Sequence, residues 1–292
     1  MSAVADEIAS QPDIWRRAAT FALEVSDRLP SRGARVAMIG CGTSFYVAAA
    51  VTTIREAEGL GESDAFVASE MPEGRAYDLV LAISRSGTTT EVVRALERLP
   101  AGTESVAVCA DADTPVVEHA GHSIVLDFAD ERSVVQTRFA TGVLALFRAS
   151  FGHDVDAIAR AAERALPQPL PVDPDDFEHF VFLGRGWAAD LADEAALKFR
   201  EAAGAWTESY PAMEYRHGPV SAAGNRTVVW TFGPVDPDLL DDVRRTGATV
   251  VKGALDPMVD LVTAQRAAVA LAEARGLDPD RPRHLARSVV LG

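Results

Sequence analysis

Cysteine is scarce in this sequence, in which Cys41 and Cys109 are the only two among 292 residues. Two thiols can form at most one disulfide bond, which cannot stabilise a chain of this length, so a disulfide-stabilised scaffold is excluded. Both cysteines lie in apolar, strand-like stretches, and buried reduced thiols are typical of proteins that work in the cytoplasm. We therefore expect a cytoplasmic protein.

Long apolar runs and excess positive charge are also missing. No stretch of about 18 uninterrupted apolar residues occurs, and the N-terminus lacks the basic start and apolar core of a secretory signal, so we expect no membrane partner. The formal net charge of -15 argues against a nucleic-acid-binding surface, which must be basic. One small anionic ligand is not excluded, because a few local donors hold a phosphate whatever the total charge.

Sequence motifs for metals and nucleotide cofactors are absent too. The chain has no H-x-x-x-H or C-x-x-C pattern, so we expect no metal. It has no G-x-x-x-x-G-K-[ST] loop, and the turn at 40–44 lacks the G-x-G-x-x-G spacing of dinucleotide sites. We expect no cofactor.

What is present is an alternation of apolar strands with helices. In the first half, strands are predicted at 35–39, 77–83, 104–110 and 123–128. Helical stretches are predicted at 13–29, from the turn at 40–44 through 57, at 91–99 and at 137–165. Residues 167–174 contain four prolines in eight positions and read as a linker. Beyond it a strand at 180–183, a helix at 188–203 and a strand at 228–232 follow.

The segments RVAMIGCGTS and HFVFLGRGWA align as a strand followed by a glycine turn, which indicates an internal duplication. Alternating strands and helices form parallel β-α-β units. We predict an α/β protein of two tandem three-layer α/β/α domains with mostly parallel sheets, covering residues 1–166 and 175–292. At about 100–200 residues per domain, the length agrees with two.

Hydroxyl side chains gather in the turn Ser84–Thr89, which follows a predicted strand and precedes a helix. Such turns lie where open parallel sheets bind ligands, and four hydroxyls with one glycine suit a phosphate monoester. The alternative is that these residues only cap a helix. In the second half, the strand at 228–232 ends in Gly233-Pro234 without serines, so only the first half is expected to have kept an anion-binding turn.

Two further groups of residues suggest proton chemistry. Glu194, Lys198 and Glu201 lie at i, i+4 and i+7 of a predicted helix and share one face; the alternative is an exposed charged stripe. His217 lies in a loop before Gly-Pro, and the histidine side chain is the one most often used to shuttle a proton. The spacing alone leaves both readings of the helix open.

These residues together resemble the sugar isomerase (SIS) family, in particular the isomerase half of glutamine–fructose-6-phosphate aminotransferase and related amino-sugar-phosphate deaminases. The resemblance covers nearly the whole chain. The matching motifs are GCGTS at 40–44, SRSGTT at 84–89, ERSVVQT at 131–137, ALKFRE at 196–201, YRHGP at 215–219 and PRHLARSV at 282–289.

The resemblance implies a role for each matched residue. The sugar phosphate would be held by Thr43, Ser44, Ser84, Ser86 and Thr89, with added charge from Arg85 where the aminotransferases have glutamine; Val134 and Gln136 would line the sugar chain.

The resemblance also assigns the catalytic steps. Glu201 would move a proton at the first two carbons, with Lys198 orienting it, contacting substrate or forming a purely structural ion pair. His217 would open the sugar ring, and in the family this histidine comes across a dimer interface. We therefore expect a homodimer with the site at the interface and a phosphorylated amino sugar as ligand.

One departure from the family pattern narrows the reaction. Arg287 stands where the aminotransferases have a lysine, and a guanidinium cannot form a Schiff base with a sugar carbonyl. We expect no aminotransfer, and Arg287 is free to stabilise an enediolate. The favoured reaction is dehydration of N-acetylglucosamine 6-phosphate. The alternatives are a glucosamine-6-phosphate deaminase or isomerase and a non-catalytic sugar-phosphate sensor.

Overall fold

The structure is a computed structural model that describes residues 2–291, and they divide into two compact units. The five-stranded unit comprises 13–131, 136–156 and the C-terminal segment from 286. The four-stranded unit comprises the segment up to residue 12, 132–135 and 157–285. The units are therefore not separated by one boundary at 167–174. The segment before residue 13 belongs to the four-stranded unit, and the segment from 286 belongs to the five-stranded unit.

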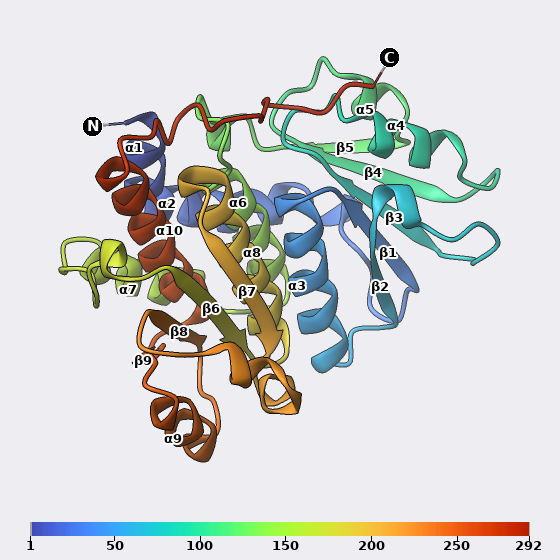
Figure 1. Cartoon of the computed structure of the whole chain (residues 1–292). Coiled ribbons are helices and arrows are strands. Elements are labelled where there is room, and N and C mark those ends of the chain that lie inside the picture. Colours follow the sequence, from blue (N-terminus) through green and yellow to red (C-terminus); the bar gives the residue numbers. More distant parts are fainter. Residues whose placement is uncertain (1, 292) are drawn as a thin grey trace. The chain divides into compact units, whose positions relative to one another are not determined.

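The five-stranded unit holds one wholly parallel sheet of order β2-β1-β3-β4-β5 (Figure 1). Its strands are β1 (Val36–Gly40), β2 (Ser63–Val67), β3 (Leu79–Ile83), β4 (Glu104–Cys109) and β5 (His122–Val125). Its helices are α2 (Gln11–Glu24), which begins in the other unit, α3 (Thr43–Ala57), α4 (Thr90–Glu97), α5 (Pro115–Glu118) and α6 (Arg138–Ser150). Short 3₁₀ turns are η1 (Ser26–Arg28), η2 (Ala68–Glu70) and η3 (Asp127–Ala129).

Every residue of β1 and β3 is buried, as expected for central strands of a parallel sheet that is covered on both faces. Their continuous apolar runs explain why the sequence pattern located them. β4 begins at the exposed Glu104 and is buried from there on. The core of the sheet is therefore built from the strands that the sequence predicted, and the α/β class with parallel strands is confirmed.

The four-stranded unit holds a second parallel sheet, of order β7-β6-β8-β9 (Figure 1). Its strands are β6 (His179–Gly184), β7 (Trp206–Pro211), β8 (Thr227–Phe232) and β9 (Thr249–Val251). Its helices are α1 (Ala3–Ala9), α7 (Val155–Ala165), which begins in the other unit, α8 (Trp187–Ala203), α9 (Pro237–Arg245) and α10 (Pro257–Ala274). Short 3₁₀ turns are η4 (Pro174–Asp176), η5 (Ala212–His217) and η6 (Pro219–Ala222).

Hydrogen bonds tie both ends of this unit together. The amides of Ala3 and Val4, at the start of α1, donate to the Asp280 carboxylate at 2.7 and 2.8 Å. An anion at a helix N-terminus satisfies unpaired amides and complements the helix dipole. The proline-rich segment is also fixed, since the Arg266 guanidinium donates to the carbonyls of Ala165 and Gln168 at 3.4 and 2.8 Å. The N-terminal helix therefore depends on residues near the end of the chain.

Asp260, in the first turn of α10, is a buried carboxyl that opposes stability at neutral pH. Burial raises its pKa to about 6, and hydrogen bonds from the backbone amides of Gly233, Leu255 and Ala254 lower the pKa by a smaller amount. The folded chain therefore holds this proton at pH values where the unfolded chain has lost it, so the stabilising contribution falls as the pH rises from about 4 through about 6.

Asp260→Asn cannot ionise at this position. We therefore expect the free energy of unfolding of the variant, minus that of the parent, to increase by roughly 3 kcal/mol when the pH is raised from about 4 to about 8. Urea unfolding of both proteins at the two pH values measures this gain. A difference between the proteins that stays constant with pH would contradict it.

Candidate functional site

The candidate site begins where the strand order of the five-stranded unit reverses. β1 pairs with β2 on one side and with β3 on the other. Ligands of open parallel sheets bind at such a reversal, outside the carboxyl ends of the strands. The two turns that leave β1 and β3 there are 40–44 and 84–89, the turns singled out from the sequence.

The hydroxyls of the turn 84–89 are close to one another. Thr88 donates from its amide to Ser86 Oγ at 3.3 Å, the Thr88 hydroxyl lies 3.2 Å from the same oxygen, and Ser84 Oγ lies 3.4 Å from Thr89 Oγ1. These are long contacts for O–H···O bonds, whose usual length is about 2.7–2.8 Å. The group can therefore exchange its internal contacts for the oxygens of an anion.

Thr89 directly precedes α4, yet its hydroxyl makes no capping bond to the helix. The interpretation that this residue only caps a helix is therefore wrong. Gly87 allows the turn to fold tightly, because its φ is +65° and an added Cβ would lie 2.1 Å from Thr114 Oγ1. No other residue type fits this position, and the hydroxyls on either side keep their arrangement.

The turn after β1 brings two more hydroxyl residues to the same edge of the sheet. Thr43 and Ser44 begin α3 and are buried. Gly40 comes so close to the helix that an added Cβ would lie 2.6 Å from the Ser44 carbonyl carbon. The close turn therefore places the first residues of α3 directly at the end of β1.

Arg85 is buried beneath this turn and paired with Glu131. Its Nη1 lies 3.3 Å from Glu131 Oε2, and the two side chains are 1% and 0% exposed. The other oxygen of Glu131 accepts from Thr137 N at 2.6 Å, Thr137 Oγ1 at 2.9 Å and Arg138 N at 2.8 Å. The charge that the sequence assigned to phosphate binding is thus balanced by a carboxylate, which also holds the start of α6.

The C-terminal segment lies along the same turn (Figure 1). Thr90 N donates to the Val289 carbonyl at 3.2 Å, and Thr88 Oγ1 donates to Ser288 Oγ at 2.9 Å. Arg287 forms an ion pair with Asp130, and its guanidinium donates to the Glu131 carbonyl. The residue that stands where the aminotransferases have a lysine therefore lies beside the hydroxyl turn.

Gln136 supplies a polar atom with no partner. Its amide oxygen is buried and accepts no hydrogen bond from any residue in the described part of the chain. Buried polar groups are nearly always paired, so such an atom indicates a missing donor. A sugar hydroxyl is a donor of the right kind.

In the four-stranded unit, α8 buries Glu194 and Lys198, two of the three charged residues that the sequence placed on one face, and leaves Glu201 partly exposed. Lys198 Nζ lies 2.5 Å from Glu201 Oε2 and 3.4 Å from Glu194 Oε1. Lys198 and Glu194 are 1% and 0% exposed, and Glu201 is 21% exposed. An exposed charged stripe is therefore the wrong reading. Of the three, the carboxylate of Glu201 is the one within reach of solvent.

His217 and Val134 lie elsewhere in this unit. His217 ends η5, is exposed, and makes no hydrogen bond or ion pair with any of residues 2–291. Val134 N donates to the Asp280 carbonyl at 3.1 Å. Its segment is fixed by the buried Glu7, whose carboxylate accepts from Arg132 N at 2.6 Å and from the Ser133 hydroxyl. The structure pairs Lys198 with Glu201, but joins neither His217 nor Val134 to them.

Three side chains at these sites received no role from the sequence: Glu131, Glu194 and Glu7. A signal existed for Glu131, because an arginine within an apolar strand-turn segment needs a carboxylate, and ERSVVQT supplied one. Glu194 was placed on the right face without a role. Glu7 carried no sequence signal, because its partners lie more than 120 residues away.

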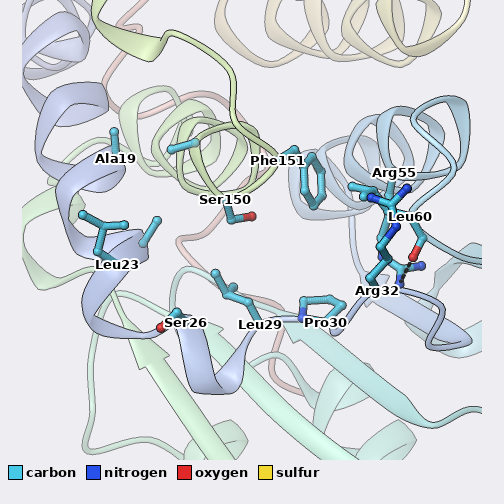
Figure 2. A pocket seen from close by; sticks show the side chains of 12 residues that line it. Ala19, Leu23, Ser26, Leu29, Pro30, Arg32, Arg55, Leu60, Ser150 and Phe151 are labelled. Atoms are coloured by element: carbon cyan, nitrogen blue, oxygen red, sulfur yellow. Dashed lines mark hydrogen bonds between the residues drawn. The ribbon is translucent and has the colours of Figure 1, made fainter.

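A cavity of about 320 Å³ in the five-stranded unit is not part of this site (Figure 2). Its lining residues include Pro30 and Leu60, which precede β1 and β2, so it lies at the amino ends of the strands. Its arginine, Arg55, already donates to the carbonyls of Ser31, Ala34 and Leu60, each at 2.9 Å. Both terminal nitrogens of this guanidinium are therefore bound within the protein, since Nη1 also donates to the Glu62 carbonyl and the Ser63 hydroxyl.

Within residues 2–291 there is no group of three or more His, Cys, Asp or Glu side chains suited to a metal ion. In the same range, no helix is both long enough and apolar enough to cross a membrane. The Cys109 thiol is buried, and burial raises its pKa to about 11, which keeps it protonated and unreactive.

Comparison with known proteins adds relatives at the level of sequence. A glutamine–fructose-6-phosphate aminotransferase of Methanothermobacter thermautotrophicus is 26% identical over 304 residues, covering 88% of this chain and 52% of that protein. The chain thus spans about half the length of the curated relatives it matches. No family model matches the chain.

Solved structures share the fold. A glucosamine-6-phosphate deaminase of Thermotoga maritima matches with a TM-score of 0.85 at 24% identity, covering 99% of this chain and 100% of that one. The C-terminal domain of a glucosamine-fructose-6-phosphate aminotransferase of Francisella tularensis matches with a TM-score of 0.85 at 20% identity, covering 97% and 98%. At these identities the likeness shows the fold alone.

Proposed function

Proceeding from the resemblance to the sugar isomerase (SIS) family, which these comparisons confirm, we propose that the chain is an enzyme acting on a hexosamine 6-phosphate. It opens the sugar ring, removes the proton at carbon 2 and, in the favoured outcome, eliminates water from N-acetylglucosamine 6-phosphate. The observation that carries the proposal is the group of hydroxyls of Ser84, Ser86 and Thr89, which make only long contacts at the reversal of the five-stranded sheet.

Substrate binding follows from the neutral donors of the two turns. Ser84, Ser86 and Thr89, together with Thr43 and Ser44, hold the phosphate through short hydroxyl contacts. Arg85 acts from behind them: its pairing with Glu131 fixes the turn. The unpaired amide oxygen of Gln136 accepts from a sugar hydroxyl, and Val134 lines the sugar chain.

Proton transfer is assigned to Glu201. Its ion pair with Lys198 holds the carboxylate in one position, which a general base requires. Glu194, on the far side of Lys198, shares the ammonium charge and fixes its position. Lys198 is therefore a positioning residue in this proposal. His217 moves the hydroxyl proton when the ring opens.

The elimination balances with these groups alone. Glu201 takes the proton from carbon 2, and the electron pair enters the C1 carbonyl to give an enediolate-type anion. The anion collapses and the bond from carbon 3 to its hydroxyl breaks. The departing oxygen takes from Glu201 the proton that Glu201 removed from carbon 2, and it leaves as water. The product is a 2,3-unsaturated sugar. Arg287 stabilises the anion electrostatically.

Deamination is the second candidate function. With a free 2-amino group, the same enolisation leads to isomerisation and hydrolytic release of ammonia. The fold likeness to the Thermotoga maritima deaminase, over 99% of this chain, favours this alternative. In both reactions Arg287 replaces a Schiff-base lysine, so aminotransfer is not proposed. A sugar-phosphate sensor would need neither Glu201 nor His217.

The proposal extends to assembly and organisation. The side chain of His217 is exposed and has no partner among the described residues. This supports a homodimer in which His217 of one copy reaches the site of the other copy. The repeated strand order of the two sheets supports two SIS-type three-layer domains, predicted at 1–166 and 175–292. A cytoplasmic location remains part of the proposal.

The test is mass spectrometry of N-acetylglucosamine 6-phosphate and of glucosamine 6-phosphate after incubation with the purified protein, with an ammonia assay in parallel. Loss of one water from the acetylated sugar without ammonia is the expected result. Ammonia from the free amine would replace the dehydratase with the deaminase. Binding of either sugar without any change in mass would identify a sensor.

A further inference from the structure

A cavity of about 870 Å³ opens at the carboxyl ends of the strands in the four-stranded unit. Its walls come from the residues that follow β6, β7 and β8 and from the first residue of α10, Pro257. β6 pairs with β7 on one side and β8 on the other, so the cavity lies at the reversal of the second sheet. None of the residues proposed to handle the hexosamine lines it.

The backbone of the turn 184–188 repeats that of the turn 40–44. Gly42 has φ 55° and ψ -127°, and Gly186 has φ 57° and ψ -138°. Each turn closes with the same pair of backbone hydrogen bonds, of 3.2 and 2.9 Å. In both, an added Cβ on the first glycine would collide with the helix that follows. The second sheet therefore keeps the backbone of a ligand-binding turn.

The side chains on this backbone differ in kind. Thr43 and Ser44 are replaced by Trp187 and Ala188, and Cys41 by Arg185. The side chain of Arg185 is exposed and makes no hydrogen bond or ion pair with any residue that the structure describes. The second turn therefore lacks the hydroxyls that suit a phosphate monoester. It carries instead the flat indole ring of Trp187 and the unpaired guanidinium of Arg185.

The remaining walls are mostly apolar, with one carboxylate. Met213, Phe232 and Val235 contribute apolar surface, and Asp236 lines the cavity after β8. Asp236 Oδ1 accepts from Asp238 N at 2.8 Å, and a carboxylate has further acceptor positions. Ligand pockets commonly hold about 300–1,000 Å³ and combine apolar walls with few polar groups.

We propose that this cavity binds a nucleotide. Its base stacks on the Trp187 indole, its phosphate pairs with Arg185, and a ribose hydroxyl donates to Asp236. The site is separate from the hexosamine site and does not rest on the proposed function. The proposed nucleotide site lies at the carboxyl ends of the strands of the second sheet. The proposed phosphate site, at the turn 84–89, lies at the corresponding edge of the first sheet.

Isothermal titration calorimetry with ADP on the full chain tests the proposal. We expect ADP to bind, and Arg185→Gln to weaken binding at least tenfold because the charge on the phosphate is lost. Trp187→Leu should weaken binding similarly, with circular dichroism confirming that the fold is kept. Arg226→Gln is the matched control: Arg226 is exposed and precedes β8 at the opposite end of the same sheet, so ADP binding should not change.

Inorganic phosphate and Ser86→Ala separate this site from others. Phosphate should bind more weakly than ADP, since it lacks a ring to stack. Equal affinity for phosphate, full ADP binding by Arg185→Gln, or loss of ADP binding in Ser86→Ala would each overturn the proposal. So would the absence of any heat of binding at about 10 mM ADP.

Discussion

Glu201→Gln is expected to lower kcat by about a thousandfold while KM for the sugar phosphate changes little, because a general base contributes roughly 10²–10⁴-fold to a rate. The amide keeps the shape of the side chain but cannot take the proton from carbon 2. Phosphate binding, which we propose that the turn 84–89 supplies, should be unaffected. Mass-spectrometric turnover assays measure both constants, and exchange of the carbon 2 proton with deuterated water follows the proton-transfer step directly.

The control for this variant is Glu178→Gln. Glu178 carries the same group in the same unit, is 67% exposed, and pairs with Arg226 at the surface. It should retain parental kcat, because an exposed pair contributes at most about 1 kcal/mol to stability and nothing to the chemistry. Full activity in Glu201→Gln would remove Glu201 from the mechanism. A loss confined to KM would assign it to substrate binding instead.

Glu131→Gln is expected to reduce the free energy of unfolding by about 3–5 kcal/mol, because it leaves the buried Arg85 guanidinium without its counter-charge. The amide oxygen can still accept from Thr137 and Arg138, so the loss falls mainly on the ion pair. Urea denaturation of the parent and the variant gives the difference. The hydroxyl turn should also become less ordered, which would appear as a higher KM.

A surface pair with the same geometry provides the comparison. Arg35 and Glu62 are also 3.3 Å apart, but their side chains are 43% and 79% exposed. Glu62→Gln should change stability by less than about 1 kcal/mol. In the double variant Arg85→Gln, Glu131→Gln, part of the lost stability should return, since two neutral amides need no counter-charge. A Glu131→Gln protein as stable as Glu62→Gln would contradict this account.

The parts of the fold that sequence reading predicted are those with a clean periodic signal. β3 is one apolar run followed by hydroxyls and glycine, and α8 shows its charged residues at helical spacing. Both were located to within two residues. The strands β2, β7 and β9 were not identified, because most of their residues are only partly buried and they mix polar and apolar side chains without strict alternation.

The environment of each candidate residue was harder to predict than its position. The spacing placed Lys198 and Glu201 together, but it could not distinguish an exposed face from a buried one. That depends on packing against α10, which lies more than 50 residues further along the chain. Arg85 was likewise assigned to phosphate, because nothing in the turn itself reveals the pairing with Glu131. The roles of the site residues stay predictions that the proposed experiments test.

The contacts made by the segment after α10 have a consequence for the folding rate. The Asp280 carboxylate accepts from amides of α1 that lie 277 and 276 residues away in sequence. Thr90 is likewise bound to the backbone of Val289 and Leu291, the latter 201 residues away. Contacts of such large sequence separation require long loops to close, which slows folding. We therefore expect both units to complete these contacts late in folding.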